Sequence, residues 1–283
     1  MCIDLHMHSI HSDGTLAPTE LVTLAASQGI KAVSLTDHDT MAGVSEAKIA
    51  GQNHNILVMN GVEVSARYDD ISVHILGYGQ ELDNPAFNNL LKALQEGREE
   101  RNKKVLVSLE KTGIPITREE LDEVSSTGLT GRPHIATILM KKGVVKSFRE
   151  AFDRYLGKGK KAWHSRFCYP AEETIAAIHG AGGAAVLAHP GHIDHSMQAQ
   201  PAIIRKLAEY GLDGLEVIYP THTRHMQAKL SELASRNHLL VTGGSDYHGH
   251  TRPANKMACI NSSFCPSEKL LFPLMERIQT HSQ

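Results

Sequence analysis

The stretch IDLHMHSIHSDGT at residues 3–15 gathers three imidazoles and two carboxylates at the end of the first apolar run. His6 and His8 are two positions apart in a segment typical of a strand, so their side chains project from the same face. Asp4 lies on that face one step deeper, and Asp13 follows in the next loop. Neutral imidazoles and ionised carboxylates together are the ligands that divalent first-row metals prefer. The stretch therefore predicts one edge of a metal site.

Residues of the same kinds recur at the ends of other short apolar runs. They are His38 in TDHD, Glu63 in GVE, His74 in SVHILGY, His189 and His192 in AHPGH, and Asp246 and His248 in GSDYH. Each motif alone has an ordinary explanation, such as a hydrogen-bonded core histidine or a turn. Buried together without partners, however, these groups would cost several kcal/mol each. A divalent cation removes that cost, so the pattern as a whole predicts a metal centre.

The bulk composition limits the kinds of partner. The chain has 283 residues, of which 41% are hydrophobic and 21% charged, as is ordinary for a soluble enzyme. Its formal net charge of −2 provides no general basic field for long nucleic acid or an anionic membrane. No segment resembles a signal peptide or a bilayer span, so a cytoplasmic location is expected. The four cysteines form no CxxC pair, and no disulfide framework is expected.

The polar motifs need strands to position them, and the sequence provides a series of such strands. Strand-like runs lie at 2–8, 31–39, 56–66, 71–79, 182–191, 212–220 and 238–249. Helix-like stretches alternate with many of these runs, which predicts βα units around a parallel sheet. A count close to seven favours a barrel over an open sheet, and active sites of such barrels lie where the carboxyl ends of the strands converge.

The middle of the chain differs from this alternating pattern. Residues 84–113 form one long helical pattern, and three shorter helical patterns follow. We therefore expect a metal-binding barrel made of residues 1–82 and 167–283, with residues 83–166 as an inserted helical cap.

Basic residues of this cap predict a phosphate clamp. Arg98, Arg101 and Asn102 share one helix face, Arg132 and His134 follow in GRPH, and Lys158 lies in the loop GKGKK. Most basic stretches are only solvated helix faces, and Lys103, Lys104 and Lys141 fit that description. Arginine, however, recognises phosphate in a bidentate manner. If metals hold one phosphate, the clamp would hold a second one, as in a bisphosphorylated nucleotide or the 5′ end of a short oligonucleotide.

The motifs together resemble a known family. DxHxH, SDGT, TDHDT, GVE, HILGY, AHPG and GSDYHG occur in the order typical of the PHP (polymerase and histidinol phosphatase) family, over nearly the whole chain. The cap motifs ERNKK, GRPHIATILMKKG and FDRYLGKGKKAW are similar to the bacterial 3′,5′-nucleoside bisphosphate phosphatases and to relatives that trim RNA 5′ ends. This resemblance implies an α/β fold with a distorted (β/α)7 TIM-like barrel. It also implies two or three divalent ions, for which we expect Mn²⁺, while Fe²⁺ or Zn²⁺ suit the same ligands.

The resemblance also implies a ligand set. His6, His8, Glu63 and Asp246 would hold the first ion; Glu63 would bridge to a second ion completed by His74 and His189; and Asp13, His38 and His248 would form a third position. Other branches carry a histidine in place of Asp13, which would also face the substrate. Asp4 would accept an imidazole N–H from behind the ligands.

A paired metal site performs phosphoester hydrolysis without a protein nucleophile, and the sequence contains no GxSxG or activated-cysteine signature. Glu63 and Asp246 would act through the ions. His192 could bind the substrate and protonate the leaving group, although a solvated loop histidine is the plainer interpretation; His222 is a weaker candidate.

The leading hypothesis is a metal-dependent phosphoesterase that removes the 3′-phosphate of nucleoside 3′,5′-bisphosphates, giving the 5′-monophosphate, and that also acts as a 5′-to-3′ exonuclease on short RNA. Alternatives are a histidinol-phosphate phosphatase, a noncatalytic PHP scaffold and an amidohydrolase for C–N bonds. The expected partners are small phosphorylated nucleotides or short oligonucleotide 5′ ends, with no membrane and no long nucleic acid as the main ligand. The oligomeric state stays open.

Overall fold

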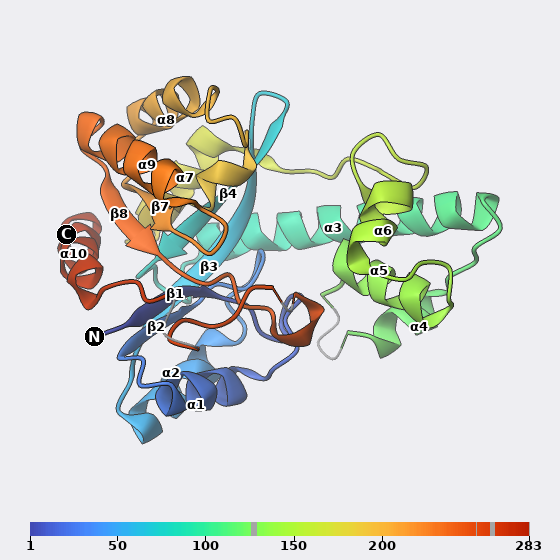
Figure 1. The fold of residues 1–283 in the computed structure, drawn as a ribbon, viewed down its shortest axis with the longest axis horizontal. Helices are drawn as coiled ribbons and strands as arrows, with labels where there is room; N and C mark the ends of the chain where they lie inside the picture. The colour runs from blue at the N-terminus through green and yellow to red at the C-terminus, as the bar shows by residue number, and fades with distance from the viewer. Residues whose placement is uncertain (126–128, 253, 261–263, 283) are drawn as a thin grey trace.

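The central element of the computed structural model is one mixed sheet (Figure 1). The structure describes residues 1–125, 129–252, 254–260 and 264–282. Within them the strands are β1 (Ile3–Met7), β2 (Ala32–Leu35), β3 (Leu57–Tyr68), β4 (Ile71–Tyr78), β5 (Tyr169–Pro170), β6 (Ala184–Leu187), β7 (Gly214–Ile218) and β8 (Leu240–Gly243). Their order is β1-β2-β3-β4-β6-β7-β8, and β5 pairs with β3. The chain therefore has an α/β fold with a mostly parallel central sheet.

One strand departs from the expected series of parallel βα units. β4 runs antiparallel to both of its neighbours, β3 and β6. The expectation of a parallel strand was wrong here because only Asp69 and Asp70 separate β3 from β4. A parallel pair needs a crossover of about a dozen residues or more. A connection of two residues therefore permits only a hairpin. Asp69 adopts a left-handed φ of 49° in this turn.

The first strand of the sheet, β1, lies next to the segment that follows the last strand, β8. Met7 forms a parallel bridge with Tyr247, and the amide of His8 donates to the Tyr247 carbonyl at 2.9 Å. The amide of Asp246 donates to the His6 carbonyl at 2.8 Å. The segment after β8 therefore lies beside the carboxyl end of β1, which brings the first and last polar motifs of the sequence together.

Helices cover the outside of the sheet. They are α1 (Pro18–Ser27), α2 (Val44–His54), α7 (Ala171–Gly180), α8 (Gln200–Glu209), α9 (Arg224–Arg236) and α10 (Leu271–His281). Short 3₁₀ turns lie at Pro190–His192 (η2), Gly249–Thr251 (η3) and Glu268–Leu270 (η4). Fully buried side chains from both layers form the core, as Ile75 and Leu215 of the sheet do with Ile204 of α8. This core fixes the strands whose ends carry the polar motifs.

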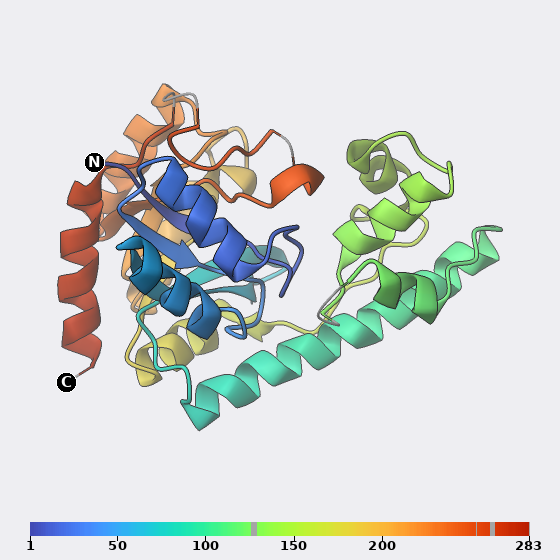
Figure 2. The same cartoon turned by 90° about the horizontal axis from the view of Figure 1, so that it is seen from below.

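A second group of helices stands apart from the sheet (Figure 2). These inserted helices are α3 (Pro85–Lys111), α4 (Arg118–Glu123), α5 (Arg132–Lys141), α6 (Phe148–Ala151) and the π-helical turn η1 (Phe152–Leu156). Asn84 caps the start of α3, since its side chain accepts from the amide of Phe87, and α3 contributes to two cores. Phe87 and Leu94 pack with the sheet, whereas Val105 and Leu109 pack with the inserted helices. One helix thus joins the two parts.

The cysteines differ from the expectation. Cys2 and Cys265 form a disulfide with a Cα–Cα distance of 5.2 Å, while Cys168 and Cys259 are free. The two partners are separated by 263 positions in the sequence. Cysteine spacing could not indicate this pairing, because it depends on the N-terminus lying beside the segment that precedes α10.

The C-terminal helix is held by a buried carboxylate. Asp213, which is 1% exposed, accepts from His179 of α7 at 2.8 Å and from Arg277 and His281 of α10 at 2.7 and 3.0 Å. Burial alone would raise the pKa of Asp213, but the hydrogen bonds from His179 and His281 outweigh burial and hold the pKa well below its usual value. The ionised carboxylate therefore stabilises the docking of α10.

We expect Asp213→Asn to lower the free energy of unfolding by about 2–3 kcal/mol at pH 7, since hydrogen bonds to a charged group are lost. A carboxyl whose pKa is lowered on folding contributes stability above its unfolded pKa of about 3.9 and loses it as the pH falls further. The difference between variant and wild type should therefore shrink below about pH 4 in urea titrations. A constant difference from pH 7 to pH 3 would contradict this role.

Candidate metal centre and substrate site

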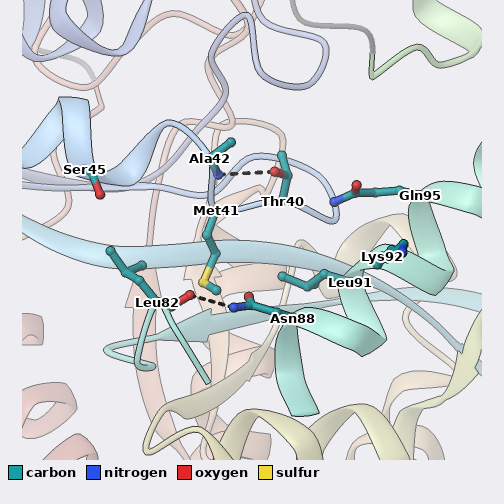
Figure 3. Close-up of a pocket in the computed structure, with 9 residues that line it drawn as sticks. All are labelled: Thr40, Met41, Ala42, Ser45, Leu82, Asn88, Leu91, Lys92 and Gln95. Carbon is teal, nitrogen blue, oxygen red and sulfur yellow. Dashed lines mark hydrogen bonds between the residues drawn. The ribbon is translucent and has the colours of Figure 1, made fainter. Parts of the chain in front are cut away.

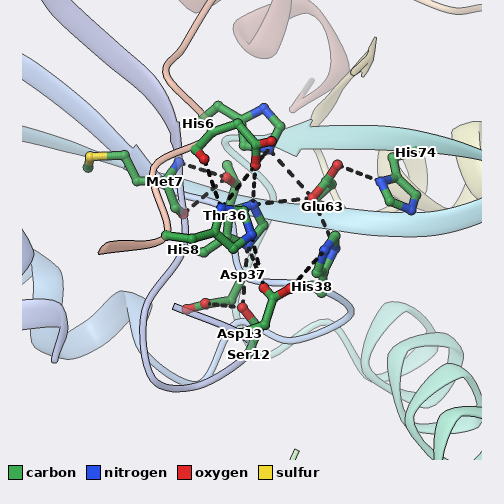
Figure 4. Close-up of polar contacts among 12 residues, drawn as sticks. His6, Met7, His8, Ser12, Asp13, Thr36, Asp37, His38, Glu63 and His74 are labelled. Carbon is green, nitrogen blue, oxygen red and sulfur yellow. Dashed lines mark hydrogen bonds and ion pairs between the residues drawn. The ribbon is translucent and has the colours of Figure 1, made fainter. Parts of the chain in front are cut away.

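Nine side chains from separate segments converge at one edge of the sheet. Figure 4 shows six of them, His6, His8, Asp13, His38, Glu63 and His74. β1 and the loop after it supply His6, His8 and Asp13; the segment after β2 supplies His38; β3 and β4 supply Glu63 and His74; the segment after β6 supplies His189; and the segment after β8 supplies Asp246 and His248. These are the nine residues that the sequence analysis proposed as ligands. The fold thus brings the proposed ligands into one cluster.

Glu63 lies at the centre of this cluster and is fully buried. Its Oε2 is 2.9 Å from Nδ1 of His38 and 3.3 Å from Nε2 of His8. Its Oε1 is 2.7 Å from Nδ1 of His74 and 2.9 Å from Nε2 of His189. The two oxygens therefore face different sets of imidazoles, as a carboxylate that bridges two ions must.

The donor atoms form three overlapping groups, and within each group all atoms lie within 4.8 Å of one another. They are His6, His8, Glu63 and Asp246; His8, Asp13, His38 and His248; and His38, Glu63 and His74. His8, His38 and Glu63 each belong to two groups. The proposed division into three separate ligand sets is therefore less sharp in space than in the sequence.

Several donor atoms of the cluster are buried and make no hydrogen bond. They are Nε2 of His6, His8 and His248, Nδ1 of His38, Oδ1 of Asp13 and Oε2 of Glu63. Buried polar atoms in folded proteins are nearly always satisfied, because an unsatisfied one costs about 1–3 kcal/mol. Here the unsatisfied atoms point at common positions and are imidazole nitrogens and carboxylate oxygens. This set fits divalent cations.

The charge balance of the cluster leads to the same conclusion. Burial alone would raise the pKa of Glu63, but His38, His74 and His6 outweigh it and hold the pKa well below the usual value. Burial also acts to raise the pKa of Asp246, which is nevertheless held well below its usual value, first by Arg252 and then by His248. Both carboxylates are thus ionised at neutral pH, and their buried negative charge attracts cations.

The backbone at the site adopts unusual conformations. Asp39, His189 and Asp246 have φ values of 58°, 29° and 52°, in a region that residues with a Cβ rarely occupy. Each of these residues follows a strand within a few positions. Such strain persists only where the surrounding structure fixes it, and it often marks functional sites.

Residues that the sequence analysis did not single out orient the imidazoles. Glu216 of β7 lies 2.9 Å from Nδ1 of His6 and accepts from the amide of His189 at 2.8 Å. The contact with an imidazole was predicted for Asp4. Asp4 instead accepts from the backbone amides of Ser245 and Ala258 at 2.8 and 3.0 Å. A lone acid inside the apolar run LEVIY was the available signal for Glu216.

Asp246 has two further partners from its own side of the sheet. The hydroxyl of Tyr219 donates to it at 2.8 Å, and Nη1 of Arg252 lies 2.9 Å away. Nη2 of Arg252 is 3.6 Å from Asp13, so this guanidinium spans two of the proposed ligands. No sequence motif distinguished Arg252 from a surface arginine.

The two candidate general acids differ in their surroundings. His192 is exposed, stacks on His189 with ring centroids 4.9 Å apart, and lies 3.1 Å from the hydroxyl of Thr221. His222 is buried with Nδ1 2.9 Å from the Val217 carbonyl, and its Nε2 accepts from the Gly191 amide at 3.1 Å. Both nitrogens of His222 are thus used in holding the turn that carries His189, and only His192 is free to face a substrate.

A cluster of arginines lies next to the metal-ligand candidates. Asp39, the residue after His38, is fully buried and lies 2.5 Å from Nη2 of Arg98 and 3.3 Å from Nη1 of Arg166. Arg166 also donates to the hydroxyl of Ser65. Arg98 was predicted as a clamp residue, whereas Arg166 was not, because it lies at the boundary of the expected cap and outside any helical pattern. Asp39 thus connects the arginines with the segment that carries His38.

Two more arginines in this cluster have no acidic partner among the described residues. Burial and then the neighbouring Arg98 and Arg166 lower the pKa of Arg101, and burial with Arg166 and Arg98 lowers the pKa of Arg132 to about 10. Nε of Arg101 donates to Asn102 at 3.0 Å, and Nη1 of Arg132 donates to the Leu156 carbonyl at 3.2 Å. The one carboxylate that the described contacts give these four guanidinium groups is Asp39, and it pairs with Arg98 and Arg166 alone. This arginine cluster, Arg98, Arg101, Arg132 and Arg166, therefore favours an anion.

The remaining clamp candidates lie around the arginine cluster. The side chain of Asn102 donates to the hydroxyl of Thr130 at 2.8 Å, and Nδ1 of His134 accepts from the Gly131 amide at 3.0 Å. Lys158 is exposed in the turn after η1. Asn102 and His134 therefore shape the cluster, whereas no described contact joins Lys158 to it.

A cavity of about 480 Å³ lies on the other side of the segment that follows His38, between this segment and α3 (Figure 3). Met41, Leu82 and Leu91 line it together with the polar side chains of Ser45 and Lys92. Gln95, which also lines the cavity, donates to the Asp39 carbonyl at 2.8 Å. This contact ties α3 to the loop of the metal-ligand candidates.

The fold and the cluster define a class of enzyme, the metal-dependent hydrolases of phosphoester bonds. Residues 4–210 match the model of the PHP domain, and the chain belongs to the PHP family. It is 37% identical over 247 residues to a 3′,5′-nucleoside bisphosphate phosphatase from Chromobacterium violaceum, covering 87% of each chain. It is 36% identical over 245 residues to a 5′-3′ exoribonuclease from Haemophilus influenzae, covering 87% of this chain and 89% of the relative.

A solved structure supports the same assignment of the fold. An amidohydrolase from Chromobacterium violaceum, with bound sulfate and no metal, superposes with a TM-score of 0.88 at 33% identity and covers 99% of this chain and 97% of its own. In the described part of the chain, no helix has the length and apolar character needed to cross a membrane.

Proposed function

We propose that the protein hydrolyses the 3′-phosphate of nucleoside 3′,5′-bisphosphates and releases the nucleoside 5′-monophosphate. The observation that supports this proposal is that two consecutive residues, His38 and Asp39, contact the metal-ligand cluster and the arginine cluster, respectively. His38 faces the metal-ligand cluster through Glu63 at 2.9 Å, and Asp39 faces the arginine cluster through Arg98 at 2.5 Å. A substrate with two phosphates on one ribose would reach both sites at once.

The nine clustered residues, His6, His8, Asp13, His38, Glu63, His74, His189, Asp246 and His248, would hold two or three divalent ions, for which we propose Mn²⁺. When bound, such ions supply a water nucleophile at neutral pH and neutralise charge on the phosphoryl oxygens. The protein's own contribution is positioning. Glu216 and Tyr219 fix the side chains of His6 and Asp246, and the inserted helices, acting as a cap, hold the second phosphate.

The arginine cluster would bind the 5′-phosphate. Guanidinium groups recognise phosphate through paired hydrogen bonds, and Arg101 and Arg132 have donors that no carboxylate in the described part of the chain uses. His192, exposed beside His189, would contact the leaving oxygen. The same arrangement suits the 5′ end of a short RNA, whose 5′-phosphate would lie in the arginine cluster while the next linkage lies at the metals. The two relatives, one named a bisphosphate phosphatase and the other an exoribonuclease, support this pair of substrates.

The polarity of the reaction tests this placement. Mn²⁺-loaded protein should convert adenosine 3′,5′-bisphosphate to adenosine 5′-monophosphate and inorganic phosphate, which ³¹P NMR distinguishes from adenosine 3′-monophosphate. Histidinol phosphate, which lacks a second phosphate for the arginine cluster, should be a poor substrate. Release of the 5′-phosphate would show that the assignment of the two sites is reversed, and efficient turnover of histidinol phosphate alone would favour the alternative phosphatase.

A further inference from the structure

A second cavity, of about 210 Å³, opens between the inserted helices and the loop that follows β8. Pro133, Phe148 and Phe152 line it from the inserted helices, and Thr251 and Arg252 line it from the loop. Figure 2 shows this loop reaching toward the inserted helices across the gap between the two parts. Sites for complete drug-sized ligands measure about 300–1,000 Å³, so this cavity suits one ring system that belongs to a larger ligand.

The cavity adjoins both of the sites described above. Arg252 forms one wall and lies 2.9 Å from Asp246 and 3.6 Å from Asp13, two of the metal-ligand candidates. Phe152 forms the opposite side, and the guanidinium carbon of Arg132 lies 5.6 Å from its ring centroid. A molecule that bridges the metal-ligand cluster and the arginine cluster therefore has this cavity beside it.

The lining indicates what the cavity would take. Phe148 and Phe152 are four residues apart along successive helical turns, so their rings share one face, and Pro133 adds another apolar surface. Aromatic rings of this kind stack on heteroaromatic bases. The charged side chains of Arg149 and Asp153 lie at the edge, where both are exposed and 3.6 Å from each other.

We propose that this cavity is the nucleobase subsite of the nucleotide substrate. The proposal rests on the proposed function, because it places the base beside the ribose whose two phosphates reach the two sites. Stacking on phenylalanine accepts every base, since each has a π face. The subsite should therefore bind adenine and uracil with affinities that differ by less than about tenfold.

The test compares substrates with and without a base on Mn²⁺-loaded protein. Adenosine 3′,5′-bisphosphate should show a KM about tenfold below that of 1,4-anhydroribitol 3,5-bisphosphate, which has the ribose ring and both phosphates but no base. Phe148→Leu should remove most of this difference by raising the KM of the nucleotide alone, with kcat unchanged. Phe148 is preferred to Phe152 because it has no contact with Arg132 among the described ring contacts. Phe272→Leu, at an exposed ring on α10, is the matched control and should change neither KM.

The outcomes separate this proposal from the proposed function. Wild-type protein that hydrolyses both substrates with the same KM would overturn the subsite and leave the proposed function standing; this comparison needs no variant. An equal effect of Phe148→Leu on both substrates would also overturn the subsite. Wild-type protein that releases phosphate from neither substrate would overturn the proposed function, and the subsite with it.

Discussion

Glu63→Gln should lower kcat/KM for adenosine 3′,5′-bisphosphate by at least about a thousandfold, or about 4 kcal/mol of transition-state stabilisation. The two oxygens of Glu63 face five imidazoles, with His38, His8 and His6 on one oxygen and His74 and His189 on the other. Glutamine keeps the shape of the side chain but removes the negative charge and one acceptor. Two of the proposed ions would therefore lose a shared ligand.

Metal analysis of the purified variant separates loss of ions from loss of fold. Inductively coupled plasma mass spectrometry should find fewer ions per chain in Glu63→Gln than in wild type, while far-UV circular dichroism stays the same. Glu232→Gln, at an exposed ion pair with Arg236, is the matched control and should keep both metal content and activity. Normal turnover by Glu63→Gln with a full complement of metal would contradict the central role of Glu63.

Arg132→Ala should raise the KM for adenosine 3′,5′-bisphosphate about tenfold or more and leave the KM for an aryl phosphate unchanged. A charge-assisted hydrogen bond to phosphate contributes about 1.5–3 kcal/mol, and only the bisphosphate offers a second phosphate to bind. Arg132 suits this test because no carboxylate neutralises it among the described residues and its pKa, though lowered to about 10, keeps it charged at neutral pH. Arg98 suits it less, because its loss would also leave Asp39 short of a partner.

Steady-state kinetics with both substrates provide the measurement. Arg236→Ala, at a largely exposed side chain on α9, is the control for a general change in charge. A similar rise of KM for the bisphosphate and for the aryl phosphate would show that Arg132 acts on the metal-ligand cluster or on folding, and not as a clamp for a second phosphate.

The α/β class and the mostly parallel sheet are predictable from the sequence because buried parallel strands produce short apolar runs with polar residues at their ends. The direction of β4 is not predictable from those runs. Its own residues satisfy the same pattern in either direction, and only the two-residue connection at Asp69 and Asp70 decides it. The disulfide between Cys2 and Cys265 is equally hidden, since it joins the two extremes of the chain.

Some residues of the candidate site are likewise predictable from the sequence, and others are not. Histidines and acids near strand ends identify themselves by type and position, and all nine lie in one cluster, which His189 joins through its contact with Glu63. Residues that act through contacts between distant parts of the chain cannot be identified in this way. Glu216 meets His6 across 210 positions, and Arg166 meets Asp39 across 127. Their partners are fixed by tertiary packing, so sequence spacing carries no signal for them.

The joint between the two parts of the molecule has a consequence for chimeric proteins. The chain enters the inserted helices along α3 and returns before β5, and Arg98 on the way out and Arg166 on the way back both bind Asp39. The insertion is thus fastened at its root to one buried carboxylate, Asp39, in the turn that follows β2. A graft of this insertion onto a relative should keep its orientation only when the cut points lie before Arg98 and after Arg166 and when the recipient supplies the matching aspartate.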